Sequence, residues 1–245
     1  MDIFMIYRTL KMIKAPIAHI QGAYFFIKMK KLNDPIGDRI GSLGEGKSID
    51  ILVIGDSSAL GVGCKTIQET ATGTLVSHLA KEFKVNYTIC AYTGFTTAQV
   101  YEKVKEIDIK KYNYIIISLG SNDIVNCTPM RIWEKQTYHL FNYIDQNFNP
   151  DQLFISAVPP FEKLKTLPNS IKNYLSYESK ILNKHYINLS NKKSNYQFID
   201  LGFEFKDNHI SEDNFHPSNI LYNIQGNRLH QLIYSDLTSK NCKAN

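Results

Sequence analysis

The sequence has 245 residues, of which 43% are hydrophobic and 12% aromatic. A chain of this length can bury one sizeable core, so we expect one compact domain or at most two. The formal net charge is +5, and residues 1–31 supply all of it, with six Lys or Arg against one Asp. The rest of the chain holds 28 − 6 = 22 basic and 23 − 1 = 22 acidic residues. A neutral body argues against a nucleic-acid groove, which needs clustered basic side chains.

The four cysteines lie far apart, and none has the spacing of a Cys-x-x-Cys or Cys/His metal site. We therefore expect a reducing, cytoplasmic environment. No run approaches the roughly 18 consecutive apolar residues of a membrane-spanning helix. The N-terminus also lacks the ordered basic region, apolar run and small-residue cleavage site of a secretory signal.

Residues 3–20 carry apolar side chains at alternating spacings of three and four, which places them on one face of a helix. Arg8, Lys11 and Lys14 fall away from that face, and Pro16 is expected to break or kink the helix. A basic amphipathic helix of this kind can rest on an anionic membrane surface. The simpler alternative is a helix that packs on the domain.

A polar, Gly-containing stretch over residues 33–47 is typical of a connection between segments. We therefore divide the chain into an N-terminal basic amphipathic segment with its connection, residues 1–47, and a main domain, residues 48–245. The predicted location is the cytoplasm, with peripheral membrane contact through residues 1–31 as the alternative.

From residue 49 onward, short apolar runs rich in Ile and Val alternate with longer helical patterns. Strand and helix alternate five times, which indicates a parallel sheet covered by helices on both faces, because right-handed crossovers place them there. The predicted fold class is therefore α/β, with a three-layer, doubly wound, five-stranded parallel sheet whose site lies beyond the carboxyl ends of the strands. The predicted strands are 49–54, 85–91, 114–119, 153–158 and 197–201, and the predicted helices are 66–83, 97–107, 131–148, 171–189 and 220–237.

The first predicted strand leads into a strand-to-helix turn with a serine at its tip, in the sequence Gly55-Asp56-Ser57-Ser58. Such a turn exposes the Ser57 hydroxyl, and the first N–H groups of the next helix can stabilise an anion beside it. Two other interpretations fit the same residues. A serine or aspartate at this place often caps the helix, and a Gly-rich turn can hold a phosphate.

Two further strands end at residues suited to stabilising a negative charge. Asn122 follows the third predicted strand in Gly120-Ser121-Asn122-Asp123, and its amide can donate to a developing oxyanion. Gly94, just beyond the second strand, can present an unobstructed backbone N–H. The alternative for Asn122 is an ordinary turn residue.

The last predicted strand is followed by Asp213-Asn214-Phe215-His216-Pro217. An Asp three residues before a His can hold one ring nitrogen while the other faces the serine. His209, two residues after Asp207, is a weaker alternative for the base because it lacks this arrangement.

The serine, the amide, the Asp and the His all follow predicted strands at one edge of the sheet. In this order they resemble the motifs of the SGNH hydrolases, also called the GDSL esterase and lipase family. The resemblance extends over about residues 49–237, most of the chain. The first block matches Gly55-Asp56-Ser57-Ser58, the second Gly94, the third Gly120-Ser121-Asn122-Asp123 and the fifth Asp213 to His216.

The resemblance implies a flavodoxin-like sandwich and a metal-free ester hydrolase. It gives Ser57 the role of nucleophile and His216 the role of base, with Asp213 orienting the imidazole. It also implies an oxyanion hole made by the Ser57 N–H, the Gly94 N–H and the Asn122 side chain. The expected activity is cleavage of a small-molecule or lipid carboxylic ester through an acyl-enzyme, as by an esterase, lipase or lysophospholipase.

Other functions stay open on the same scaffold. An acyltransferase or a thioesterase would use the same acyl-enzyme, whereas a non-catalytic phosphate-binding module would use only the turn from Gly55 to Gly63. The loops that are expected to bind the substrate show no sequence pattern that identifies it. Residues 159–169 form either part of an acyl-binding wall or an ordinary surface loop. Leu221 stands where family members often have a Gly, which changes the helix packing behind His216.

Overall fold

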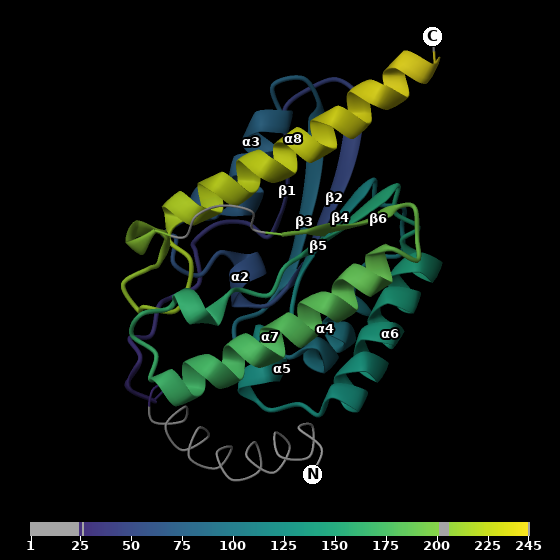
Figure 1. Cartoon of the computed structure of the whole chain (residues 1–245). Helices are drawn as coiled ribbons and strands as arrows, with labels where there is room; N and C mark the ends of the chain where they lie inside the picture. Colours follow the sequence, from purple (N-terminus) through teal and green to yellow (C-terminus); the bar gives the residue numbers. More distant parts are fainter. Residues whose placement is uncertain (1–24, 26, 201–205, 245) are drawn as a thin grey trace.

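The computed structural model describes residue 25 and residues 27–200 and 206–244. Six strands form one sheet in the order β1-β3-β2-β4-β5-β6, which confirms the predicted α/β class (Figure 1). Strands β2 to β6 run parallel to one another, and β1 pairs antiparallel with β3. The strands are β1 (Ile40–Leu43), β2 (Ser48–Gly55), β3 (Lys84–Ala91), β4 (Tyr114–Ser118), β5 (Gln152–Ser156) and β6 (Tyr196–Ile199).

Strand β1 was not expected, because the sequence predicts only a connection over residues 33–47. Its side chains explain why: Ile40 is 72% exposed and Leu43 is 50% exposed, so the strand shows no buried apolar face. It is held by backbone pairing at the edge of the sheet, with Ile40 opposite Thr88 and Leu43 opposite Val85. The five predicted parallel strands are therefore joined by a sixth, antiparallel edge strand.

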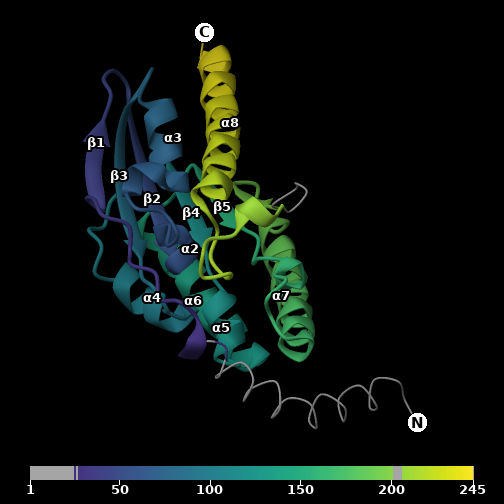
Figure 2. The ribbon, with the colours of Figure 1, turned by 90° about the vertical axis from the view of Figure 1, so that its left-hand side faces the viewer.

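Helices cover both faces of the sheet (Figures 1 and 2). One apolar cluster packs α4, α6 and α7 against one face, and a second packs α3 and α8 against the other. The short helices α2 and α5 follow the carboxyl ends of β2 and β4. The helices are α2 (Ser57–Leu60), α3 (Ala71–Leu79), α4 (Thr97–Val104), α5 (Ser121–Val125), α6 (Met130–Asn147), α7 (Asn169–Ser190) and α8 (Asn219–Ala244), with 3-10 turns at Ile67–Glu69, Phe161–Lys163 and Asp207–His209.

The predicted helix over 66–83 begins later than expected, at Ala71. Thr70 is the reason, since its side-chain oxygen accepts a hydrogen bond from the Gly73 N–H over 3.1 Å and caps the helix there. The residues before it form a separate 3-10 turn, Ile67–Glu69.

No helix in the described part of the chain combines the length and the apolar character needed to cross a membrane. The predicted amphipathic helix over residues 3–20 lies outside the described residues. Described residues of the same N-terminal segment begin with Phe25, which packs against the apolar cluster on the α4, α6 and α7 face.

Candidate active site

Ser57 is the first residue of α2, directly beyond the end of β2. The turn is tight enough to require Gly55, because a Cβ at that position would lie 2.3 Å from the Ala59 Cβ and 2.3 Å from the Ser118 oxygen. Asp56 caps the helix by accepting a hydrogen bond from the Ser58 N–H over 2.9 Å. The local sequence thus fixes the serine at the carboxyl edge of the sheet.

Ser57, His216 and Asp213 form one hydrogen-bonded chain. The Ser57 Oγ lies 2.9 Å from the His216 Nε2, and the His216 Nδ1 lies 2.5 Å from the Asp213 Oδ2. All three residues are buried, with exposed fractions of 7%, 9% and 3% respectively. The serine and the histidine are 159 positions apart in the sequence, so the fold itself creates this contact.

Asp213 accepts hydrogen bonds from backbone N–H groups as well as contacting the His216 imidazole. Its Oδ1 accepts hydrogen bonds from the backbone N–H groups of Phe215 (2.9 Å) and His216 (3.0 Å). Burial alone raises the pKa of Asp213, but the hydrogen bonds from the His216 ring and the Phe215 backbone outweigh it, and the pKa is lowered. An ionised Asp213 favours a proton on Nδ1, which leaves Nε2 able to accept the Ser57 proton.

Gly94 lies at the third position of a turn that begins at Tyr92, in which the Phe95 N–H donates to the Tyr92 oxygen over 3.3 Å. Its φ is +81°, and in the described part of the chain no heavy atom beyond Gly94 and its two chain neighbours lies within 4 Å of the place where a Cβ would stand. A positive φ at this position is typical of a type II turn. The Gly94 backbone is therefore open on the side where a side chain would otherwise stand.

Asn122 lies in α5 and contacts the Gly94 turn. Its Nδ2 donates to the Phe95 oxygen over 3.1 Å, and a side-chain amide has a second N–H available for another acceptor. The next residue, Asp123, accepts from both the N–H and the hydroxyl of Thr97 at the start of α4. The loop after β3 and the loop after β4 are thus joined to each other, on either side of the end of β2.

The sequence matches the family described as GDSL-like Lipase/Acylhydrolase over residues 53–224, more than two thirds of the chain. The chain belongs to this family. Its members are hydrolases, and we therefore interpret the site of this GDSL-like hydrolase as a hydrolase site.

Solved structures show the same fold at low identity. A proposed arylesterase from Agrobacterium tumefaciens str. C58 is 19% identical, with a TM-score of 0.59 over 76% of this chain and 99% of that chain. A carbohydrate esterase family 2 enzyme with a carbohydrate binding domain, from Corynascus thermopiles (Myceliophthora fergusii), is 14% identical, with a TM-score of 0.59 over 83% of this chain and 69% of that one. The psychrotrophic esterase EstA from Pseudoalteromonas sp. is 14% identical, with a TM-score of 0.52 over 77% and 98%. No curated protein matches the sequence.

His209 does not take the place of His216 beside the serine of this GDSL-like hydrolase. It is the last residue of the 3-10 turn Asp207–His209, and its Nδ1 accepts a hydrogen bond from the Lys206 N–H over 3.2 Å. Its backbone oxygen accepts from the Ser218 N–H, so His209 supports the loop that carries His216.

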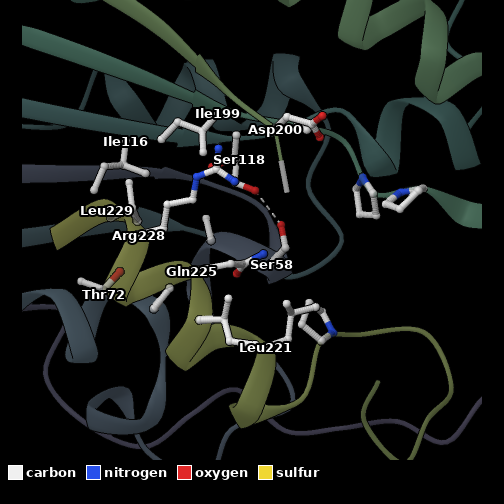
Figure 3. Close-up of a pocket in the computed structure, with 18 of the residues that line it drawn as sticks. Ser58, Thr72, Ile116, Ser118, Ile199, Asp200, Leu221, Gln225, Arg228 and Leu229 are labelled. Atoms are coloured by element: carbon white, nitrogen blue, oxygen red, sulfur yellow. Dashed lines mark hydrogen bonds between the residues drawn. The ribbon is translucent and has the colours of Figure 1, made fainter. Parts of the chain in front are cut away.

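The polar side chains of Asp56, Ser58 and Ser118 form a hydrogen-bonded network next to Ser57 in the sequence and at the end of β4. The Ser58 hydroxyl donates to the Asp56 Oδ1 over 2.7 Å and lies 2.9 Å from the Ser118 hydroxyl, the contact dashed in Figure 3. Burial raises the pKa of Asp56, against the effect of the Ser58 hydrogen bonds. Its Oδ2 has no hydrogen-bond partner among the described residues. Asp56 therefore braces the turn through the N–H and the hydroxyl of Ser58, and the Ser58 hydroxyl extends the network to Ser118, 60 positions away in the sequence.

A cavity of about 90 Å³ lies between the sheet and α8 (Figure 3). Neither Ser57 nor His216 lines it, but their sequence neighbours Ser58, Phe215 and Pro217 do. Leu221, the departure from the family pattern, is buried against this space. Residues 159–169 contribute Pro159, Pro160 and Leu164 to its wall, and Leu164 is buried.

In the described residues, no group of three or more His, Cys, Asp or Glu side chains is arranged to hold a metal ion. Cys64, Cys90 and Cys127 form no disulfide with one another, and burial raises the pKa of both Cys64 and Cys90 to about 12. Protonated thiols of this kind are poor nucleophiles and poor metal ligands.

Proposed function

We propose that this GDSL-like hydrolase cleaves carboxylic esters through an acyl-enzyme formed on Ser57. The observation that carries the proposal is the chain from the Ser57 Oγ to the His216 Nε2 (2.9 Å), continued from the His216 Nδ1 to Asp213. A serine in hydrogen-bond contact with a base that is itself oriented by a third group is the arrangement that activates a nucleophile.

In the proposed reaction, the Ser57 oxygen attacks the ester carbonyl while His216 takes its proton. The resulting imidazolium is stabilised by Asp213, and the negative charge on the substrate oxygen is held by the Ser57 N–H, the Gly94 N–H and the Asn122 amide. The alcohol leaves with the proton from His216. Water then attacks the acyl-enzyme by the same route and releases the acid.

The proposed substrate is a small-molecule or lipid ester. The structural relatives include a carbohydrate esterase and a proposed arylesterase. These relatives support ester cleavage, but they do not identify the acyl group or the alcohol of the substrate. Thioester cleavage and acyl transfer to an alcohol share the same acyl-enzyme. An added acceptor alcohol separates transfer from hydrolysis, because in a transferase the alcohol attacks the acyl-enzyme in place of water and a new ester forms instead of the acid.

We also propose that residues 1–31 make peripheral contact with an anionic membrane surface. In the described part of this segment, Ile27 is 76% exposed and Lys28, Lys30 and Lys31 are exposed beside it. Exposed apolar and basic side chains together suit the headgroup region of an anionic bilayer. A variant lacking residues 1–31 should lose sedimentation with phosphatidylserine vesicles while still unfolding in one cooperative thermal transition. Equal sedimentation of both proteins would contradict this contact.

Hydrolysis of p-nitrophenyl acetate tests the proposed activity. The wild-type protein should release nitrophenol, and Ser57→Ala should reduce the rate to that of the uncatalysed reaction. Ser235→Ala is a matched control, because this exposed serine lies on α8, away from the site. Full activity of Ser57→Ala would overturn the proposal.

A further inference from the structure

The side chain that precedes Gly94 is tied to the N-terminal connection. The Thr93 Oγ1 donates a hydrogen bond of 2.6 Å to the Asp34 Oδ1, across 59 positions of sequence. The Asp34 Oδ2 accepts from the Arg39 Nη2 over 3.0 Å, and the Arg39 Nη1 donates to the Ala91 oxygen over 2.8 Å. Ala91 is the last residue of β3 and comes directly before this turn. Asp34 and Arg39 therefore connect the Thr93 side chain to the end of that strand.

The turn that these contacts hold carries a proposed oxyanion donor in its central peptide. That peptide joins Thr93 to Gly94, and type I and type II turns differ by a rotation of this peptide that reverses the direction of its N–H. Gly94 permits the type II form through its φ of +81° but does not enforce it, because glycine adopts either sign of φ. This rotation leaves the Thr93 side chain in place, so the contact of that side chain with Asp34 fixes the position of the whole turn relative to the sheet.

The far side of the same turn is held separately. Asn122 donates to the Phe95 oxygen, and Asp123 binds Thr97. On the near side, the described hydrogen bond from the Thr93 side chain is the one to Asp34. Asp34 therefore supplies an anchor that Asn122 and Asp123 do not replace.

We propose that Asp34 is a positioning residue that, through Thr93, directs the Gly94 N–H toward the oxyanion formed during ester cleavage. This inference rests on the proposed function of Ser57. Arg39 holds the Asp34 carboxylate in place, and its guanidinium also lies 5.4 Å from the centre of the Tyr92 ring at the start of the turn.

The ion pair between Arg39 and Asp34 is partly exposed, so a role in positioning the Gly94 turn can be distinguished from a role in folding stability. The side chains of Arg39 and Asp34 are 36% and 44% exposed. Exposed ion pairs contribute little to folding stability. Loss of Asp34 should therefore change turnover without a comparable change in the melting temperature.

The test compares Asp34→Ala and Thr93→Val with Thr93→Ser, using p-nitrophenyl acetate. Loss of an entire oxyanion donor lowers kcat by about 10² to 10³, and a loosened donor retains part of its effect, so we expect kcat to fall roughly tenfold in the first two variants. KM should change less than about twofold, because the contact acts on the transition state. Thr93→Ser keeps the hydroxyl and should retain most of the wild-type kcat. Asp38→Ala, an exposed Asp in the same segment, is the matched control.

A second readout is the rate of labelling by a fluorophosphonate, whose phosphoryl oxygen would occupy the oxyanion position. This rate should fall together with kcat in Asp34→Ala and Thr93→Val, while each melting temperature stays within about 3 °C of the wild type. Wild-type kcat in both variants would overturn the inference. So would a loss of kcat in Thr93→Ser equal to that in Thr93→Val, or a loss matched by a large fall in melting temperature. Labelling of Ser57→Ala would instead overturn the proposed function, so the two failures are distinguishable.

Discussion

Asp123 accepts two hydrogen bonds from Thr97, one from the backbone N–H over 2.9 Å and one from the hydroxyl over 2.7 Å. This contact connects the residue after Asn122 to the start of α4, beyond the Gly94 turn. Both residues are buried, with exposed fractions of 2% and 1%. The two loops that carry the proposed oxyanion donors therefore share a buried carboxylate.

Burial raises the pKa of Asp123 to about 6, against the opposing effect of its hydrogen bonds from Thr97. The folded state then holds a proton on Asp123 that the unfolded state releases near the ordinary aspartate pKa of 3.8. The contribution of this residue to the free energy of unfolding should therefore fall as pH rises from about 4 to about 6, by up to about 3 kcal/mol.

Urea denaturation of the wild type and of Asp123→Asn between pH 4 and pH 7.5 measures this contribution. The asparagine keeps a carbonyl oxygen for Thr97 and cannot ionise. The difference in free energy of unfolding, wild type minus variant, should decline with rising pH and level off above the pKa. A difference that stays constant with pH would show that Asp123 does not change its protonation over this range.

Asn122→Ala removes a proposed oxyanion donor together with the hydrogen bond to the Phe95 oxygen. We expect kcat for p-nitrophenyl acetate to fall by about 10² to 10³, because the developing charge loses a fixed donor. Asn126→Ala, at the exposed C-terminal end of the same helix, should leave kcat unchanged. Similar activity of the two variants would place the oxyanion away from Asn122.

Gly55→Ala and Gly94→Ala should differ in their effect on folding. At Gly55 the added methyl would meet the Ser118 backbone oxygen at 2.3 Å, so we expect a protein that fails to fold or melts far lower. At Gly94 there is room, and the cost is the positive φ alone, about 1–2 kcal/mol. Thermal melting of both variants checks this order, and a Gly94→Ala protein that melts below Gly55→Ala would contradict it.

Asp213→Asn should lower kcat by about 10⁴, because an amide facing the His216 Nδ1 favours the tautomer that cannot accept the Ser57 proton. The backbone N–H groups of Phe215 and His216 still find an oxygen acceptor, so the loop should keep its conformation. Steady-state kinetics give the effect, with Asp207→Asn in the same region as the control. Comparable kcat values for the two variants would remove Asp213 from the mechanism.

The parallel part of the fold could be predicted because each of its strands is a short apolar run. Predicted and observed bounds of β2 to β6 agree within two residues at each end. The edge strand β1 gave no such pattern, since it is held by backbone pairing while Ile40 and Leu43 face solvent. The predicted helix over residues 66–83 starts too early, because Thr70 caps the N-terminus of α3 and apolar periodicity does not reveal such a cap.

The site residues could be selected because each lies in a short motif between a predicted strand and the next predicted helix. The structure brings Ser57, Asp213 and His216 into contact, and their roles stay predictions until activity is measured. The contact between Asp34 and Thr93 could not be predicted, because it joins two exposed polar residues 59 positions apart and neither belongs to a pattern. The cavity beside α8 was equally hidden, since its wall comes from segments spread over the whole domain.

The activated serine is the central claim, and intact-protein mass spectrometry after incubation with a fluorophosphonate tests it most directly. The wild-type protein should gain the mass of one phosphonyl group, whereas Ser57→Ala should gain none and His216→Ala should react far more slowly. Ser235→Ala should label as the wild type does. Labelling of Ser57→Ala at the wild-type rate, or no labelling of a folded wild-type protein, would contradict the account.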